Sequence, residues 1–148
     1  MKKILPLFAL MFAFEAHASC TVYSSTSSSE VSATLDAHGW GFKNYAQICA
    51  KLNQANAEFL VQANATVLGG RSIGWAAIAM KDRNSAITTA AYGGLATRLS
   101  VDAGMDVAAN IMMEAINQAV DLTDIDQAIK SLNAARQAAR VANLPKKK

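Results

Sequence analysis

The residues with the clearest chemical potential are a histidine and an aspartate, His38 and Asp36, which are separated by a single residue. An aspartate that orients a histidine, with a nearby serine as nucleophile, is the arrangement of a serine hydrolase. Asp-x-His is also a common sequence by chance, and we interpret His38 as a loop histidine without a catalytic role. A small hydrolase or ligand-binding enzyme that uses His38 is the alternative.

Two aromatic residues in the segment Gly39-Trp40-Gly41-Phe42 form a second candidate site. Aromatic side chains held between glycines suit a loop that stacks on a sugar ring or inserts into a partner protein. With His38, they are the candidate binding residues of the sequence. The alternative, which the small number of aromatic residues favours, is that Trp40 and Phe42 fold back over the neighbouring helix as part of the core.

Metal ligands and cofactor-binding motifs are not indicated by the residue spacing. Methionines at helical spacing are typical of a packed apolar helix face. Asp121, Asp124 and Asp126 do not have the spacing of a calcium loop and are better explained as acids at the start of a helix. We therefore expect neither a metal nor a cofactor.

Residues 1–18 are typical of a bacterial secretory signal. Lys2 and Lys3 precede an apolar run over residues 4–14, and small residues flank His17 in front of a cleavage site between Ala18 and Ser19. The run is shorter than the roughly 20 residues of a membrane span. A retained N-terminal helix is the alternative. We expect a periplasmic or secreted protein without a transmembrane segment.

Both cysteines, Cys20 and Cys49, follow the predicted leader, and an oxidising compartment favours a disulfide between them. In the chain-entropy model such a bridge contributes roughly 3 to 4 kcal/mol. A lipid attached to Cys20 is the alternative, although the preceding His17-Ala18-Ser19 is a poor match to a lipoprotein signal.

Two helices are expected in the first part of the chain that follows the leader. A polar serine-rich loop over residues 24–29 leads into a short helix over 30–37. Apolar residues at three- and four-residue spacing then predict an amphipathic helix over 43–56.

The middle of the chain predicts a sheet. Alternation of apolar and polar residues over 59–67 indicates a half-buried strand, and glycines or polar residues separate it from further strands at 72–80, 85–91 and 95–100. One long helix that ends at Gly69 is the alternative, because the same apolar residues also have helical spacing. Two helices follow, over 102–120 and after Thr123.

The predicted fold is α+β: an N-terminal helix, an antiparallel sheet of three to four strands, and two C-terminal helices packed on one face. The chain is divided into a signal peptide (1–18), a disulfide-tied segment with the serine-rich loop (19–41), a single α+β domain (42–143) and a basic tail (144–148). The 26 alanines beyond the leader predict a core of small side chains.

The composition favours a binding protein over an enzyme. A net charge of +3 leaves no strong field for nucleic acid. No motif for paired carboxylates or for cradling phosphate is apparent. We expect a small exported, non-enzymatic protein that binds another protein or a component of the cell envelope.

Overall fold

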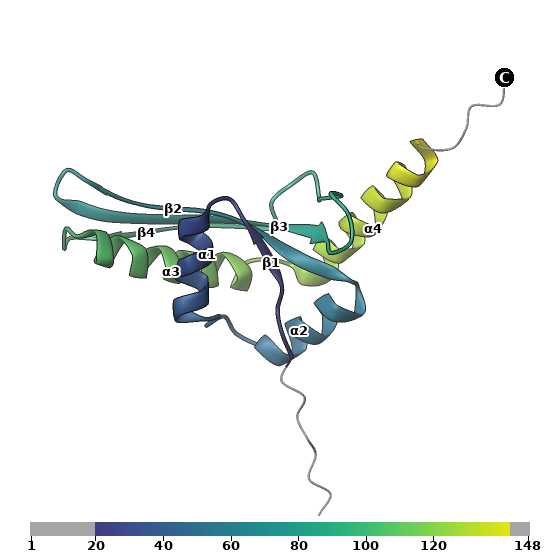
Figure 1. Cartoon of the computed structure of the whole chain (residues 1–148), viewed down its shortest axis with the longest axis horizontal. Helices are drawn as coiled ribbons and strands as arrows, with labels where there is room; N and C mark the ends of the chain where they lie inside the picture. The colour runs from purple at the N-terminus through teal and green to yellow at the C-terminus, as the bar shows by residue number, and fades with distance from the viewer. Residues whose placement is uncertain (1–19, 143–148) are drawn as a thin grey trace, which may run out of the picture.

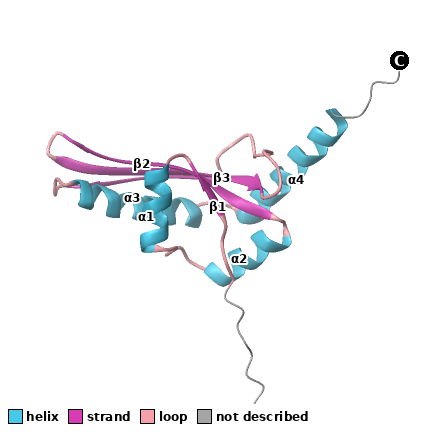
Figure 2. Ribbon diagram, viewed as in Figure 1, coloured by secondary structure: helices cyan, strands magenta, loops and turns pink. Residues whose placement is uncertain are grey.

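The computed structural model describes residues 20–142 and has the predicted α+β fold, with four helices and one four-stranded sheet in this range (Figure 2). The predicted leader, with its cleavage site between Ala18 and Ser19, and the basic tail 144–148 lie outside the described residues. In chain order the elements are β1 (Ser24–Thr26), α1 (Ser29–His38), α2 (Tyr45–Gln54), β2 (Ala57–Leu68), β3 (Arg71–Asp82), β4 (Gly94–Ser100), α3 (Met105–Asp121) and α4 (Ile125–Ala142).

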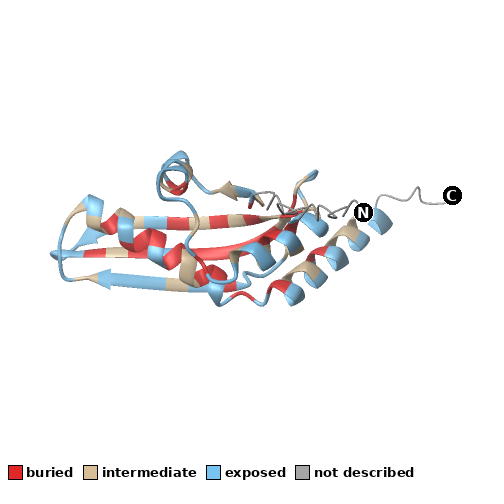
Figure 3. Cartoon of the chain, turned by 90° about the horizontal axis from the view of Figure 1, so that it is seen from below, coloured by how far each residue is buried: buried red, intermediate tan, exposed pale blue. Residues whose placement is uncertain are grey.

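The sheet has the order β1-β2-β3-β4; α3 lies along one side of it, and α1 crosses in front of the strands in the view of Figure 1. The pairs β2–β3 and β3–β4 are antiparallel. Helix α3 runs along the strands and packs on β2, β3 and β4. Helix α4 projects from one end of the sheet (Figure 1). The buried residues gather on α3 and the central strands, and the edge strand β4 is largely exposed (Figure 3).

Helix α3 approaches β3 and β4 so closely that two strand positions have room only for glycine. A Cβ atom at Gly74 would overlap the backbone of Met112, and one at Gly94 would overlap the carbonyl group of Ala119. Ala115 and Ala119 of α3 are completely buried at this contact layer. Small side chains therefore allow the close approach that the alanine-rich composition predicted.

The predicted strand over 59–67 is confirmed, and the alternative of one long helix to Gly69 is wrong. Residues of β2 alternate between buried and partly buried through its first half. Gly69 and Gly70, both at positive φ, form the turn to β3, a conformation that glycine adopts without steric cost. The two strands pair over their full length, from Ala57 opposite Asp82 to Leu68 opposite Arg71.

The strand predicted over 85–91 is wrong, because this segment follows β3 only in places. Its one bridge joins Thr88 to Lys81. The Thr89 hydroxyl oxygen accepts the hydrogen bond of the Met80 N–H at 3.1 Å, where a regular strand would offer a main-chain carbonyl. A side chain thus replaces a ladder bond, and the segment 83–93 becomes a connection that leads into β4.

The serine-rich segment 24–29, predicted as a loop, contains the short strand β1. Ser24, Ser25 and Thr26 pair in parallel with Phe59, Leu60 and Val61, so that the sheet is mixed and not wholly antiparallel. Parallel neighbours need a long crossover connection, and α1 and α2 supply it. Two helices therefore precede the long hairpin, as the patterns over 30–37 and 43–56 predicted, although the predicted overall fold named a single N-terminal helix.

The N-terminal segment shares its core with the rest of the chain. Val22, Val31 and Leu35 lie in the same buried cluster as Phe59 of β2 and Leu132 of α4. Residues 20–41 therefore pack as part of the α+β fold, and one hydrophobic core includes residues on both sides of the predicted boundary at position 42.

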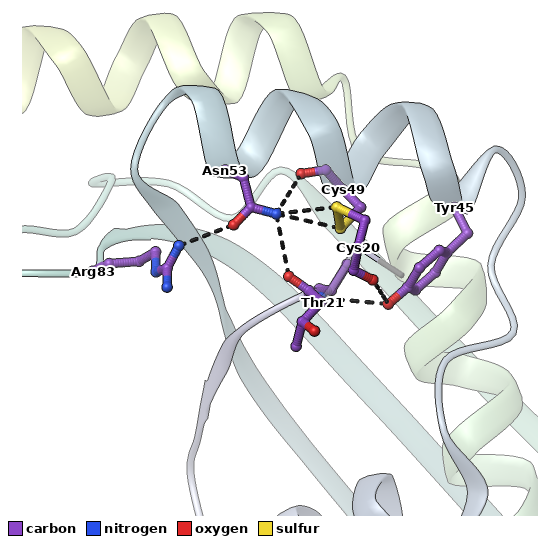
Figure 4. The surroundings of a disulfide bond; sticks show 7 residues. Cys20, Thr21, Tyr45, Cys49, Asn53 and Arg83 are labelled. Carbon is purple, nitrogen blue, oxygen red and sulfur yellow. Dashed lines mark hydrogen bonds between the residues drawn. A yellow bond between two sulfur atoms is a disulfide. The ribbon is translucent and has the colours of Figure 1, made fainter. Parts of the chain in front are cut away.

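The predicted disulfide joins Cys20 to Cys49, with a Cα–Cα distance of 6.0 Å (Figure 4). The amide nitrogen of Asn53 donates to the carbonyl oxygens of Thr21 and Cys49 at 3.3 and 3.0 Å, and the Tyr45 hydroxyl donates to the Cys20 carbonyl at 3.0 Å. The bond ties the start of the described chain to α2. A sulfur atom in a disulfide does not carry a lipid, so this structure does not support the lipid alternative at Cys20.

Candidate interaction surface

The structure does not assemble the hydrolase arrangement around His38. Asp36 and His38 both lie on α1, where residues two apart do not face each other. His38 is exposed in the last turn of the helix. Within residues 20–142, no hydrogen bond or ion pair joins its side chain to a carboxylate or to a serine.

A serine motif that the sequence interpretation missed is Gly70-Arg71-Ser72-Ile73-Gly74, which matches the Gly-x-Ser-x-Gly pattern of the nucleophile elbow. That elbow exposes its serine between a strand and a helix, whereas Ser72 lies within β3 and is completely buried. Its hydroxyl donates to the Asp102 carbonyl at 2.8 Å and accepts from the Gly104 N–H at 3.1 Å. Ser72 therefore holds the β4–α3 connection and has the surroundings of a structural residue.

Trp40 and Phe42 belong to an aromatic cluster. The ring of Trp40 lies 5.5 Å from Phe42 and 5.7 Å from Phe59, centroid to centroid. Phe42 is buried and also stacks on Tyr45 at 5.3 Å. The backbone N–H of Gly41 donates to the Asn117 side chain at 2.8 Å, which fixes this loop on α3. The core-packing alternative thus describes Phe42, and half-buried Trp40 packs on the edge of the core.

The second face of the sheet is left uncovered by α2 and α3, and the start of α1 borders it beside Gln62, Asn64 and Trp75. Side chains alternate between the faces of a sheet, and the completely buried Phe59 and Ile78 mark the helix side. The even-numbered residues of β2 and the odd-numbered residues of β3 and β4 therefore point to the other side. The strand register aligns them in three rows: Gln62-Ala77-Leu95, Asn64-Trp75-Thr97 and Thr66-Ile73-Leu99.

The apolar residues of this surface are Leu68, Ile73, Trp75, Leu95 and Leu99, which we call the open face. Leu68, Leu95 and Leu99 are 69%, 63% and 64% exposed, and Trp75 is 39% exposed. Val101, which follows β4, is exposed as well. Scattered exposed leucines are normal, but a contiguous apolar patch marks a binding surface more often than not.

One end of this second face is closed by the chain itself. The Tyr92 hydroxyl donates to the Gln62 side chain, so that Tyr92 crosses β3 above Ala77 and Ala79, which are buried. Beyond them, Lys81 forms an ion pair with Glu58 at 2.7 Å. The uncovered area is thus the end of the sheet near the β2–β3 turn.

The three rows from Gln62 and Leu95 to Thr66 and Leu99 contain no charged side chain. Charges lie at their border: the exposed Arg71 is opposite Leu68 in the next row, and Glu30 at the start of α1 lines a hollow beside Trp75. Depletion of charge is the compositional signal of the centre of a protein–protein interface, and a tryptophan is a typical anchor there. Trp75 lies in the middle row of the middle strand.

A buried ion pair, which the sequence interpretation also missed, lies beneath the polar cleft between α4 and the end of β3. Arg136 and Asp82 approach to 2.6 Å, and Arg136 also donates to the carbonyls of Ala55 and Asn56 at 3.0 and 2.9 Å. Burial would raise the pKa of Asp82, but hydrogen bonds from Ser85 and the Asn84 N–H, together with Arg136, outweigh it and lower this pKa. Every group is paired, which identifies the cluster as structural.

Within residues 20–142, no group of three His, Cys, Asp or Glu side chains is placed to hold a metal ion. The same part of the chain has no helix that is long and apolar enough to cross a membrane. Comparison with protein-family models, with curated proteins and with solved structures finds no match to this chain.

Proposed function

We propose that this is a small exported, non-enzymatic protein that binds another protein or a component of the cell envelope through the open face. The observation that carries the proposal is the uncharged patch around Trp75, Leu95 and Leu99 on β3 and β4. Burial of apolar surface is the main driving force of protein association. A partner that covers an exposed apolar patch of this kind is therefore expected to gain more binding free energy than one that covers a polar part of the surface.

Export is supported by two independent features. Residues 1–18 have the pattern of a secretory signal. The Cys20–Cys49 disulfide is of a kind that persists in the periplasm or outside the cell and is rare in the cytosol. A leader that directs the chain to an oxidising compartment and a bridge that forms there are consistent with each other.

The test is site-specific photo-crosslinking in cells that export the full chain. A photoreactive amino acid is placed at Leu95, and in a second variant at Leu122, which has a similar exposure of 59% but lies at the end of α3. We expect a discrete covalent adduct from position 95 and none from position 122. Absence of an adduct from position 95, or equal adducts from both, would contradict the proposal.

A further inference from the structure

We infer that the partner of the open face is the open face of a second copy of the chain, so that two sheets pack face to face in a two-fold symmetric dimer. The inference depends on the proposed function, because it identifies the partner of that same surface. Four features of the patch lead to a second copy: its area, its lack of charge, its position in the sheet and the place of Trp75.

The exposed area matches what one partner of a stable complex contributes. Leu68, Leu95, Leu99 and Trp75 are 69%, 63%, 64% and 39% exposed, and Asn64, Thr66 and Thr97 between them are exposed as well. Together they offer a surface of the same order as the roughly 800 Å² that each partner contributes to an interface of standard size. Two such faces would bury an area within the range of specific complexes. The two hollows beside Trp75, of about 350 and 300 Å³, are at the small end of the range for ligand pockets, so the surface suits a protein better than a small molecule.

The absence of charge removes the main obstacle to self-association. A symmetric interface places each residue near its own copy or near one other residue, so any charged group on the axis meets a like charge. The three rows around Trp75 contain none, and Arg71 and Glu30 lie at their border, away from an axis near Trp75. Partner selection by complementary charge, which is how two different proteins avoid wrong pairs, has no basis within these rows.

The sheet geometry suits face-to-face packing. Antiparallel sheets stack about 10 Å apart, with their strands inclined by about 30° and the side chains of both inner faces interdigitated. Trp75 is in the middle row of the middle strand, so a two-fold axis near it brings the two tryptophans to the centre of the interface. Leu95 and Leu99 of β4 then lie to one side of Trp75 in each copy. Large aromatic residues at the centre of an interface carry most of its binding energy.

Helix α3 leaves this arrangement unobstructed. In each copy α3 and the buried Gly74 and Gly94 are on the opposite side of the sheet. The dimer therefore has four layers, with helices outside and two sheets inside. This arrangement covers the sheet face that the single chain leaves in water.

Light scattering coupled to size-exclusion chromatography tests the inference. Protein produced from the full chain in an exporting host is measured at about 50 µM, where an interface of this size is expected to be occupied. We expect the molar mass of a dimer, twice that of one chain. The L95K/L99K variant places two lysines from each copy in the interface, and we expect it to elute with the one-fold mass.

The matched variant is L122K, which introduces a lysine at a similarly exposed leucine outside the open face. It is expected to keep the two-fold mass. Circular dichroism of L95K/L99K distinguishes a folded monomer from an unfolded chain, and single L95K and L99K variants replace it if the double variant does not fold. A wild-type protein with the one-fold mass overturns the inference, as does a dimer that L95K/L99K leaves intact.

The crosslinking experiment separates this inference from the proposed function. An adduct from position 95 with the mass of two chains supports a second copy. A wild-type monomer whose position 95 crosslinks to a different protein overturns the second copy and leaves the proposed binding function in place. A monomer that forms no adduct from position 95 contradicts both.

Discussion

At the scale of single residues, the Arg136 guanidinium connects three parts of the chain. It donates from α4 to the Ala55 and Asn56 carbonyls, which form the turn between α2 and β2, and pairs with Asp82 at the end of β3. A buried ion pair contributes little compared with an apolar replacement, but removing one partner leaves the other charge uncompensated. The loss of stability caused by a substitution in this ion pair therefore depends on the charged group that stays buried without its partner.

Replacing Arg136 with alanine is expected to lower the free energy of unfolding by about 3 kcal/mol, because Asp82 and two carbonyls lose their partner. The side chains of Arg136 and Asp82 are only 17% and 11% exposed. The matched variant is K51A, whose ion pair with Asp126 is exposed and is expected to contribute less than about 1 kcal/mol. Urea denaturation of both variants gives the comparison, and equal losses would contradict the structural role of Arg136.

The stability of the protein is expected to depend on the ionisation of Asp82. The folded-state pKa of Asp82 lies below its ordinary value of 3.8, so the folded protein binds a proton less readily than the unfolded chain. The stabilisation is complete above the unfolded pKa and is lost as the pH falls through the folded pKa. Unfolding free energies measured by denaturant between pH 7 and pH 2 should therefore fall less steeply below about pH 4 for D82N than for the wild type. Parallel curves at low pH would show that Asp82 does not contribute.

At the scale of elements, local patterns identified most strands and helices but not their partners. Alternation over 59–67 was sufficient for β2, and apolar spacing was sufficient for α2 and α3. The run at 85–91 contains the β-branched Ile87, Thr88 and Thr89, which predict a strand, although only Thr88 forms a bridge. Ser24–Thr26 has no apolar pattern, and it is a strand only because the exposed edge of β2 lies beside it. In both segments the available neighbouring strand determines whether a strand forms, and the local propensity of the residues does not.

The close packing of α3 on β4 is expected to be sensitive to a single methyl group. In G94A the added Cβ would overlap the Ala119 carbonyl, so that the helix or the strand has to move, and we expect a loss of about 3 kcal/mol. G41A is the matched variant, because its Cβ would approach only the flexible Asn117 side chain at 3.2 Å. Thermal unfolding measures both. A G94A protein as stable as G41A would mean that the helix–sheet spacing adapts freely.

At the scale of the whole molecule, the open face could not be predicted from the sequence. Residues 75–80 of β3 are apolar without interruption, which indicates burial on both faces of the strand. Ala77 and Ala79 are buried as this pattern implies, by the Tyr92 segment, whereas Trp75 is not. Which apolar residues stay exposed depends on how far the segment 83–93 reaches, and no local pattern encodes that distance. The glycine-flanked Trp40 and Phe42, which the sequence indicates as a candidate binding site, pack on Phe59.

The disulfide acts on the whole molecule, because it ties the segment that carries Val22 and β1 to α2 across a separation of 29 residues. Closing a loop of this length reduces the entropy of the unfolded chain, and we expect reduction to lower the unfolding free energy by roughly 3 kcal/mol. Urea denaturation with and without a thiol reductant measures the loss. The C20S/C49S variant should have the stability of the reduced protein and should not respond to the reductant, since it has no bond to break. If reduction changes nothing in the wild type, then β1 and the buried Val22 hold the N-terminal segment in place without the covalent bond.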